Sequence, residues 1–327
     1  MMENQKRLQG LAQRHGLSAP SEFLRYPKFI QIETVATCNA RCVMCPVEEW
    51  ERSSLLMKDA LFDRILADLS QHAHEIEMVA PQLHGEPLID KKFERRVRQL
   101  KQVGIKDTKI SSNASLLDAS RAETVMECGL DEITFSIDGA TKSTFEAIRV
   151  RMNYEKCVEN ILHFIKVRDR RGSPMRIRVR MTVMEKNIGE YDEFLKFWSS
   201  HLRPQDTAYG KLVHNWGSWL AGYRLPKMQD REEMNSSPCP SPWTSLVILS
   251  DGRVPLCCSD FNAIEEVGNV NRTSIQEIWQ SEVMTSYRNR HLAQGRKCMS
   301  MCIDCNVWDD SSKITNRIEE RLPAFTF

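Results

Sequence analysis

Three cysteines in one short segment, TVATCNARCVMCP, are the residues of this chain best suited to holding a metal cluster. Cys38, Cys42 and Cys45 have the spacing C-x3-C-x2-C. Three thiolates on one loop can bind three corners of a [4Fe–4S] cube, because soft thiolate ligands suit iron–sulfur clusters. The fourth iron would then lack a protein ligand and could bind a substrate or a cofactor. A zinc knuckle or three unrelated buried thiols are the alternatives to this interpretation.

A second group of cysteines lies closer to the C-terminal end, where six fall between residues 239 and 305. They are Cys239, Cys257, Cys258, Cys298, Cys302 and Cys305. Asp251-Gly252, within SLVILSDGRVPLCC, predicts the turn of a β-hairpin just before the adjacent pair. Four cysteines at such spacings also suit a structural zinc ribbon. Cys128 and Cys157 lie in helix-like segments and are interpreted as small buried hydrophobes.

Strand-like and helix-like stretches alternate from residue 28 to about residue 215, which is typical of βαβ units. Strands are expected near 28–34, 75–82, 107–112, 131–137, 175–184 and 207–214. Helices are expected near 57–69, 90–103, 118–128, 141–168 and 189–200. Six such units predict an α/β fold with a partial (β/α)6 barrel, and a doubly wound sheet is the alternative. In both folds ligands bind at the C-terminal ends of the strands, where the first cysteine loop falls.

Several predicted strands carry polar side chains on one face. In MRIRVRMTVM, the residues Arg176, Arg178, Arg180 and Thr182 alternate with an apolar row. Parallel strands that are buried on both faces should read as nearly continuous apolar runs. We therefore expect one face of the sheet to line a wet, polar cavity. An antiparallel sheet with one solvated face is the alternative, but it fits poorly with the intervening helices.

The overall composition excludes several classes of partner. The chain has 327 residues, of which 41% are hydrophobic and 27% charged, as in an ordinary globular protein. A net charge of +1 predicts no general attraction to nucleic acid or to an anionic membrane. No apolar run is long enough to span a bilayer, and the N-terminus lacks the apolar core of a signal peptide. We therefore expect a cytoplasmic protein, in which eleven cysteines indicate metal or redox chemistry.

Three short segments end successive predicted strands: HGEP at 84–87, SNAS at 112–115 and SIDG at 136–139. Together with the first cysteine loop, they resemble the radical S-adenosylmethionine (radical SAM) family, whose open iron is chelated by the amino and carboxylate groups of SAM. The resemblance implies that Glu86 binds the SAM ammonium and that Gly85 lets the chain approach the cofactor closely.

The same resemblance assigns expected roles to further strand-end residues. Asn113 matches a position that often carries Asn in the family, with Ala114 in place of the usual glycine, and His84 replaces another glycine. Ser136 and Asp138 are expected to face the ribose of SAM or the substrate. Arg178 or Arg180 could hold the methionyl carboxylate of SAM, as a guanidinium is suited to do.

The C-terminal pattern resembles the SPASM/twitch domain, a β-hairpin plus a helix that carries auxiliary [4Fe–4S] clusters. Because no cysteine follows Cys305, the resemblance is to the shortened, single-cluster twitch form. The implied ligands are Cys239, Cys257, Cys302 and Cys305, and Cys258 could replace Cys257. The expected division is a helical extension at 1–27, a barrel at 28–214, a linker at 215–238 and an auxiliary-cluster domain with a C-terminal tail at 239–327.

The implied chemistry is abstraction of a hydrogen atom from a small polar substrate by a 5′-deoxyadenosyl radical, with an external one-electron donor such as flavodoxin or ferredoxin. We expect a SAM-dependent dehydrogenase of a sugar or aminocyclitol, in which the auxiliary cluster accepts the second electron. Arg180 and His214 are candidates for orienting or deprotonating the substrate hydroxyl. The first alternative is an epimerase, in which Cys298 would return a hydrogen atom.

Two further alternatives come from other classes. A peptide maturase fits less well, because only 37 residues precede Cys38, which is short for the usual peptide-binding module. An iron–sulfur electron carrier or a zinc-bound interaction protein would not need HGEP, SNAS and SIDG at three strand ends.

Overall fold

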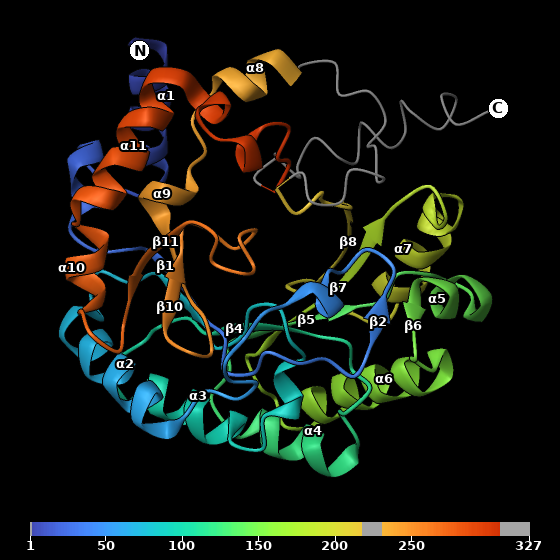
Figure 1. The fold of residues 1–327 in the computed structure, drawn as a ribbon. Coiled ribbons are helices and arrows are strands. Elements are labelled where there is room, and N and C mark those ends of the chain that lie inside the picture. Colours follow the sequence, from blue (N-terminus) through green and yellow to red (C-terminus); the bar gives the residue numbers. More distant parts are fainter. Residues whose placement is uncertain (1, 218–230, 308–327) are drawn as a thin grey trace.

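Seven parallel strands form an open arc in the computed structural model, which describes residues 2–217 and 231–307 (Figure 1). Their spatial order is β9 (Ser245–Ile248), β1 (Phe29–Ile32), β3 (Met78–Ala80), β4 (Lys109–Ser112), β5 (Glu132–Ser136), β7 (Arg176–Val183) and β8 (Thr207–Leu212). The arc consists of a three-stranded and a four-stranded sheet, which a parallel bridge between Val79 and Thr108 connects. The six strands expected from the sequence are all present.

Six helices follow the strands and lie on the outside of the arc (Figure 1). They are α2 (Asp59–His72), α3 (Phe93–Gln102), α4 (Ala119–Met126), α5 (Lys142–Ile148), α6 (Tyr154–Arg170) and α7 (Tyr191–Ser199). A doubly wound sheet would carry helices on both faces. The helices of one outer layer therefore confirm the partial (β/α)6 barrel.

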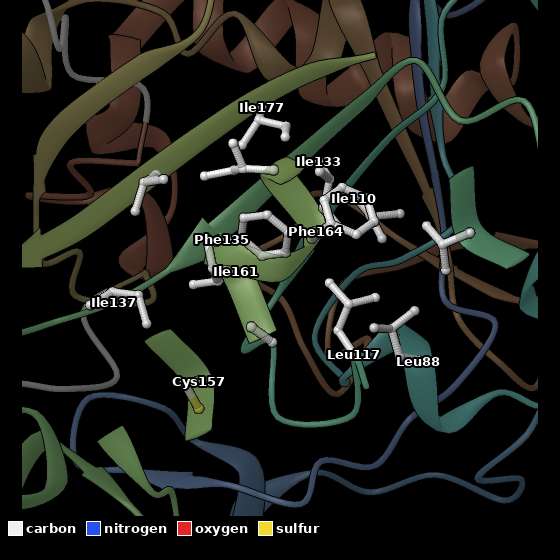
Figure 2. Packing of buried hydrophobic residues seen from close by; sticks show 14 of the residues in the cluster. Leu88, Ile110, Leu117, Ile133, Phe135, Ile137, Cys157, Ile161, Phe164 and Ile177 are labelled. Carbon is white, nitrogen blue, oxygen red and sulfur yellow. The ribbon is translucent and has the colours of Figure 1, made fainter. Parts of the chain in front are cut away.

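The apolar row of each strand packs beneath these helices. Figure 2 shows Ile133 and Phe135 of β5 and Ile177 of β7 among side chains of α6. The rings of Phe135 and Phe164 meet edge to face, with centroids 5.5 Å apart. Along β7, buried and half-buried residues alternate strictly, and the arginines are the half-buried ones. The predicted polar row is thus confirmed as the inner face of the arc. Cys157 lies in the same apolar cluster, as expected.

The helix expected at 141–168 is interrupted, and this expectation was wrong. A short strand, β6 (Arg149–Val150), separates α5 from α6 and pairs antiparallel with β2 (Arg41–Cys42). Asn153 ends the interruption, because its side chain accepts a hydrogen bond from the Lys156 amide and caps α6. The break places Arg149 directly opposite Cys42 of the cysteine loop.

The expected hairpin near residue 251 has a turn but a different pairing. Gly252 adopts a φ of 92°, which suits glycine in a tight turn. However, β9 pairs in parallel with β1 of the barrel, while β10 (Arg253–Pro255) pairs with β11 (Glu266–Asn269). The C-terminal segment therefore contributes a strand to the barrel sheet, because the first edge of β1 would otherwise expose unpaired backbone groups.

The remaining helices pack around this C-terminal segment. They are α1 (Met2–Arg14), α8 (Arg231–Ser236), α9 (Ser241–Thr244), α10 (Ile275–Trp279) and α11 (Glu282–Gln294), with the short 3₁₀ turns η1 (Pro20–Leu24), η5 (Gly295–Cys298) and η6 (Ser300–Cys302). Three further 3₁₀ turns, η2 (Val47–Glu49), η3 (Pro87–Ile89) and η4 (Ile188–Glu190), belong to the barrel part of the chain. The N-terminal extension is helical, as expected, and α1 lies beside α11 (Figure 1). The Asn4 amide donates hydrogen bonds to the carbonyls of Ser236 and Leu292.

Parts of two expected segments lie outside the described residues. These are residues 218–230 of the linker and the C-terminal tail beyond residue 307. The domain boundaries at 27, 214 and 238 stay predictions. Among the described residues, every helix is too short or too polar to cross a lipid bilayer.

Candidate functional site

A cavity of about 330 Å³ opens at the C-terminal ends of the strands, between the first cysteine loop and the C-terminal segment. Most of the expected site residues line it: Cys38, Cys42, Cys45, Gly85, Glu86, Asn113, Ser136, Arg180 and His214. The wet cavity predicted from the polar strand faces is therefore present, at the end of the barrel where ligands of this fold class bind.

The cysteine loop is folded by its own backbone and by β6. The Cys45 amide donates to the Cys42 carbonyl at 3.0 Å, which closes a turn between the two ligands. Burial raises the pKa of all three thiols, to about 12 at Cys45. At Cys42 the nearby Arg149 guanidinium opposes this effect. Arg149 therefore partly offsets the cost of a thiolate at Cys42, although the pKa of this thiol stays raised.

The donor set is suited to an iron–sulfur cluster. Cys38, Cys42 and Cys45 line one cavity together. A [4Fe–4S] cube binds each thiolate at a different iron. These three cysteines could therefore hold three irons of such a cube.

Glu86 lies in the wall of this cavity and is almost completely buried. Its carboxylate accepts hydrogen bonds from the Asn113 amide (2.8 Å), the Ser112 hydroxyl (2.8 Å) and the Leu88 amide (3.2 Å). Burial raises the pKa of Glu86, although these three bonds favour the ionised form. A carboxylate can accept about four bonds, so one position remains for an ammonium group of a ligand.

Gly85 is required by the packing of the backbone around it. A Cβ at this position would lie 2.4 Å from the Val35 carbonyl oxygen and 2.7 Å from that of Thr37. The glycine therefore allows the HGEP segment to press against the backbone that leads into the cysteine loop. Gly85 also lines the cavity, and its expected approach to the cofactor stays a prediction. The Glu86 amide adds a hydrogen bond to the Thr37 carbonyl.

Asn113 connects the end of β4 to the cysteine loop. Its side-chain amide donates to Asn39 at 2.9 Å and lies 3.9 Å from the Cys38 sulfur. Ala114, which stands where a glycine is usual, has a φ of 62° and is fully buried. The left-handed turn is kept without glycine, at a cost of roughly 1–2 kcal/mol.

Asp138 lies outside the lining of the cavity and is engaged by protein partners, so its expected contact with ribose or substrate stays a prediction. Its carboxylate accepts bonds from Arg149 at 2.7–2.8 Å and from the Thr182 amide at 2.6 Å. Arg149 does line the cavity, although the sequence did not single it out. Asn153 could have revealed the position of Arg149 from the sequence, because an N-cap at Asn153 implies that Arg149 lies before the helix.

The two candidate arginines of β7 have different environments. Arg178 lies outside the cavity wall, where its guanidinium stacks over Tyr209 at 4.2 Å and lies 3.8 Å from Glu132. Arg180 lies two residues closer to the C-terminal end of the strand and lines the cavity. It donates to the Ser136 hydroxyl at 2.9 Å. Of the two, only Arg180 is placed to touch a ligand there.

His214 and Lys211 complete the wall beyond β7. Burial and the nearby cations Lys211 and Arg180 lower the pKa of His214 to about 3, so its imidazole is neutral near pH 7. Its Nδ1 atom is buried without a hydrogen-bond partner among the described residues. Lys211 was not identified from the sequence, but β8 places it opposite Thr182 on the polar face. Burial and Arg180 lower the pKa of Lys211.

A second, smaller cavity collects the C-terminal cysteines. Its lining includes all four expected ligands, Cys239, Cys257, Cys302 and Cys305, together with Cys258 and Arg296. Cys258, Ser259 and Val307 line both cavities, so these residues form a shared wall.

The expected role of Cys298 as a hydrogen donor is not supported by its position in the structure. It lies in neither lining but in an apolar cluster with Ile278 and Trp279.

His84 connects the barrel to the segment that carries the C-terminal cysteines. Its Nδ1 atom lies 3.2 Å from a Glu33 oxygen, and its Nε2 atom lies 2.8 Å from the Cys258 carbonyl oxygen. Glu33 directly follows the first strand and is paired with Arg52 at 2.8 Å. The replacement of glycine by histidine in HGEP therefore adds a link between the barrel and the auxiliary cysteines.

Two family models match the chain. The model of the radical SAM superfamily matches residues 32–197, and that of SPASM, an iron–sulfur cluster-binding domain, matches residues 239–306. The chain belongs to the radical SAM superfamily. This radical SAM protein accordingly uses SAM and a [4Fe–4S] cluster, with further cluster binding in its C-terminal SPASM domain. The shortened twitch form stays a prediction.

Curated relatives of this radical SAM protein have different functions. A tungsten-containing aldehyde ferredoxin oxidoreductase cofactor-modifying protein of Pyrococcus furiosus is 24% identical over 325 residues, covering 86% of this chain and 88% of the relative. A probable GTP 3′,8-cyclase of Sulfurisphaera tokodaii is 26% identical over 169 residues, but the match covers only 51% of either chain.

Solved structures with the same fold include small-molecule and peptide complexes. BtrN in complex with AdoMet and 2-DOIA has a TM-score of 0.60 at 20% identity, over 87% of this chain and 95% of BtrN. Streptococcus suis SuiB bound to its precursor peptide SuiA has a TM-score of 0.64 at 13% identity, over 91% and 74%. At these identities the likeness establishes the fold alone.

We expect Glu86→Gln to weaken SAM binding about tenfold to a hundredfold, because it removes a charge-assisted bond worth roughly 1.5–3 kcal/mol. Calorimetry on the reconstituted protein measures the affinity, and Glu77→Gln, which changes a surface carboxylate beside His15, is the matched control. Unchanged affinity with an intact iron content would show that HGEP serves only as a turn.

Gly85→Ala should displace the cysteine loop, because the added Cβ would overlap backbone oxygens that cannot move independently. The iron content after anaerobic reconstitution should fall to about half that of the parent protein, while the C-terminal cluster stays bound. Gly189→Ala is the control, since a Cβ there has no atom within 4 Å. A full iron content in Gly85→Ala would contradict this account of the loop.

Proposed function

We propose that this radical SAM enzyme oxidises a carbinol of a small polar substrate, such as a sugar or an aminocyclitol, to a ketone. The shared wall of the two cavities is the observation that carries the proposal. Cys258 and Ser259 border both the space beside the first cysteine loop and the space enclosed by the C-terminal cysteines. A substrate in the larger cavity would therefore lie next to a second electron acceptor.

When bound, SAM and the clusters supply the hydrogen-abstracting radical and a one-electron acceptor, and the protein supplies position and proton transfer. Glu86 would hold the SAM ammonium through its one remaining acceptor position. Arg149, fixed by Asp138 beside Cys42, would face the SAM carboxylate. This assignment replaces the one expected for Arg178, which lies outside the cavity.

Substrate oxidation removes one hydrogen atom, one proton and one electron from the carbinol. SAM, when bound, would supply the radical that takes the hydrogen atom of the C–H bond, and the auxiliary cluster would accept the remaining electron. The hydroxyl proton would pass to the neutral imidazole of His214, which lines the cavity. Arg180 would orient the oxygen from the β7 side.

Epimerisation is the second candidate, and a specific thiol favours it. Cys298 lies outside both cavities, but Cys258 lines the larger one and is left over if Cys239, Cys257, Cys302 and Cys305 bind the auxiliary cluster. A free Cys258 could return a hydrogen atom to the substrate radical. We favour oxidation, because the cluster provides an acceptor whether or not Cys258 is one of its ligands.

The relatives widen the range of substrates to be tested. BtrN binds 2-DOIA, a small molecule, beside AdoMet, whereas SuiB binds a peptide. The cofactor-modifying protein of Pyrococcus furiosus covers most of this chain. The enclosed volume of about 330 Å³ supports a small substrate, since SAM must share it.

The number of clusters is the first test. We expect about eight irons per chain after anaerobic reconstitution, from two [4Fe–4S] clusters with separate ligands. Replacing Cys38, Cys42 and Cys45 by Ala should leave about four irons and abolish 5′-deoxyadenosine formation. Cys128→Ala is the control, because this thiol is buried away from both cavities. Stoichiometric zinc without sulfide in the untreated protein would contradict the proposal.

The choice between oxidation and epimerisation is tested with Cys258→Ser, using a panel of sugars and aminocyclitols in D₂O. A dehydrogenase needs Cys239 and Cys257 for product formation. It tolerates Cys258→Ser, provided that Cys257 is the ligand of the auxiliary cluster. Cys298→Ala should be active in either case and serves as the control. One solvent deuterium at an inverted carbon, lost in Cys258→Ser, would assign epimerisation instead.

A further inference from the structure

Two cations in the larger cavity have no acidic partner in the described part of the chain. Arg180 donates to the Ser136 hydroxyl, and Lys211 lies 3.4 Å from the Val307 carbonyl oxygen. The Nε atom of Arg180 is buried without any partner among the described residues. By contrast, Arg176 on the same strand pairs with both Asp107 and Glu132.

The strand register places these two cations on the same face of neighbouring strands, in diagonal positions. In the β7–β8 pair, Tyr209 lies opposite Arg180, and Lys211 lies opposite Thr182. Both side chains therefore project from the polar face of neighbouring strands, roughly 8 Å apart at their Cα atoms from ordinary strand spacing. An anionic group between them can contact a guanidinium and an ammonium together.

The other charges of the cavity are already accounted for. Arg149 pairs with Asp138 and lies beside the first cysteine loop, where the SAM carboxylate is expected. Glu86 is the carboxylate of the HGEP segment, and its remaining acceptor position suits the SAM ammonium. Neither assignment uses the cations of β7 and β8, so SAM bound in this way provides no counter-charge for them.

We propose that the substrate carries a phosphate group, which binds between Arg180 and Lys211 on the β7–β8 wall of the cavity. Two full positive charges match a phosphate dianion better than a single carboxylate, and a guanidinium fork can bind two of its oxygens. His214 lies in the same wall, where its imidazole could contact a neighbouring hydroxyl. This inference rests on the proposed function, since it names the substrate class of the same site.

Inorganic phosphate is the probe, titrated by calorimetry into the reconstituted holoenzyme saturated with SAM. We expect saturable binding that Arg180→Gln and Lys211→Met each weaken about tenfold or more, while Lys211→Arg retains it. Arg178→Gln is the matched control, because it removes an arginine of the same strand outside the cavity. SAM affinity should stay unchanged in all four variants.

Several results would overturn the inference. Absence of phosphate binding to the parent protein would do so, as would acetate binding with the same affinity as phosphate. Loss of SAM affinity in Arg180→Gln would assign this arginine to the SAM carboxylate. A shifted reduction potential of the auxiliary cluster in Lys211→Met, with phosphate affinity unchanged, would make the lysine a counter-charge of that cluster.

Failure of this inference is separable from failure of the proposed function. Phosphate binding is measured without turnover. Oxidation of a neutral polyol by a protein that binds no phosphate would overturn the phosphate site and leave the proposed oxidation intact. Oxidation of a phosphorylated sugar, lost in Lys211→Met but retained in Arg178→Gln, would support both.

Discussion

The buried carboxylate of Glu33 holds together the parts of the molecule on which the site depends. It is fully shielded from solvent and receives hydrogen bonds from Arg52, from the Ser250 amide and from His84. Burial raises the pKa of Glu33, but the bonds from His84 and Arg52 outweigh it and lower the pKa overall. A buried charge is stable only when it is paired in this way, and removing one partner typically costs about 3–5 kcal/mol.

The partners of Glu33 come from three segments that are distant in the sequence. Arg52 follows the first cysteine loop, His84 begins the HGEP segment, and Ser250 follows the strand that the C-terminal segment adds to the barrel. Two cysteine groups, each able to hold a cluster, are thereby fixed on opposite sides of one cavity. This charge acts together with the pairing of β9 with β1 and with a shared apolar cluster in fixing the two groups relative to each other.

Much of this arrangement could be predicted from the sequence, because strand alternation and strand-end segments are local signals. The inner row of β7, the cysteine loop and the segments around Glu86 and Asn113 were all found in this way. The break before α6 was missed because the apolar spacing continues across Arg149. The pairing of β9 with β1 depends on an open sheet edge that only the assembled barrel reveals. The orientation of Asp138 and the burial of Cys298 were likewise decided by tertiary contacts.

The strand that the C-terminal segment contributes to the barrel has a consequence for the folding of the protein. Phe29 pairs with Met78 on one side and with Ser245 on the other, so the first strand of the barrel gains its second neighbour only after most of the chain has been synthesised. Pairings between residues so far apart form late in folding, because closing the loop costs entropy before contacts repay it. The first cysteine loop begins a few residues after this strand and therefore acquires its final support late. We therefore expect a chain truncated before β9 to present the thiols of the first cysteine loop without the part of the cavity wall that Cys258 and Ser259 supply.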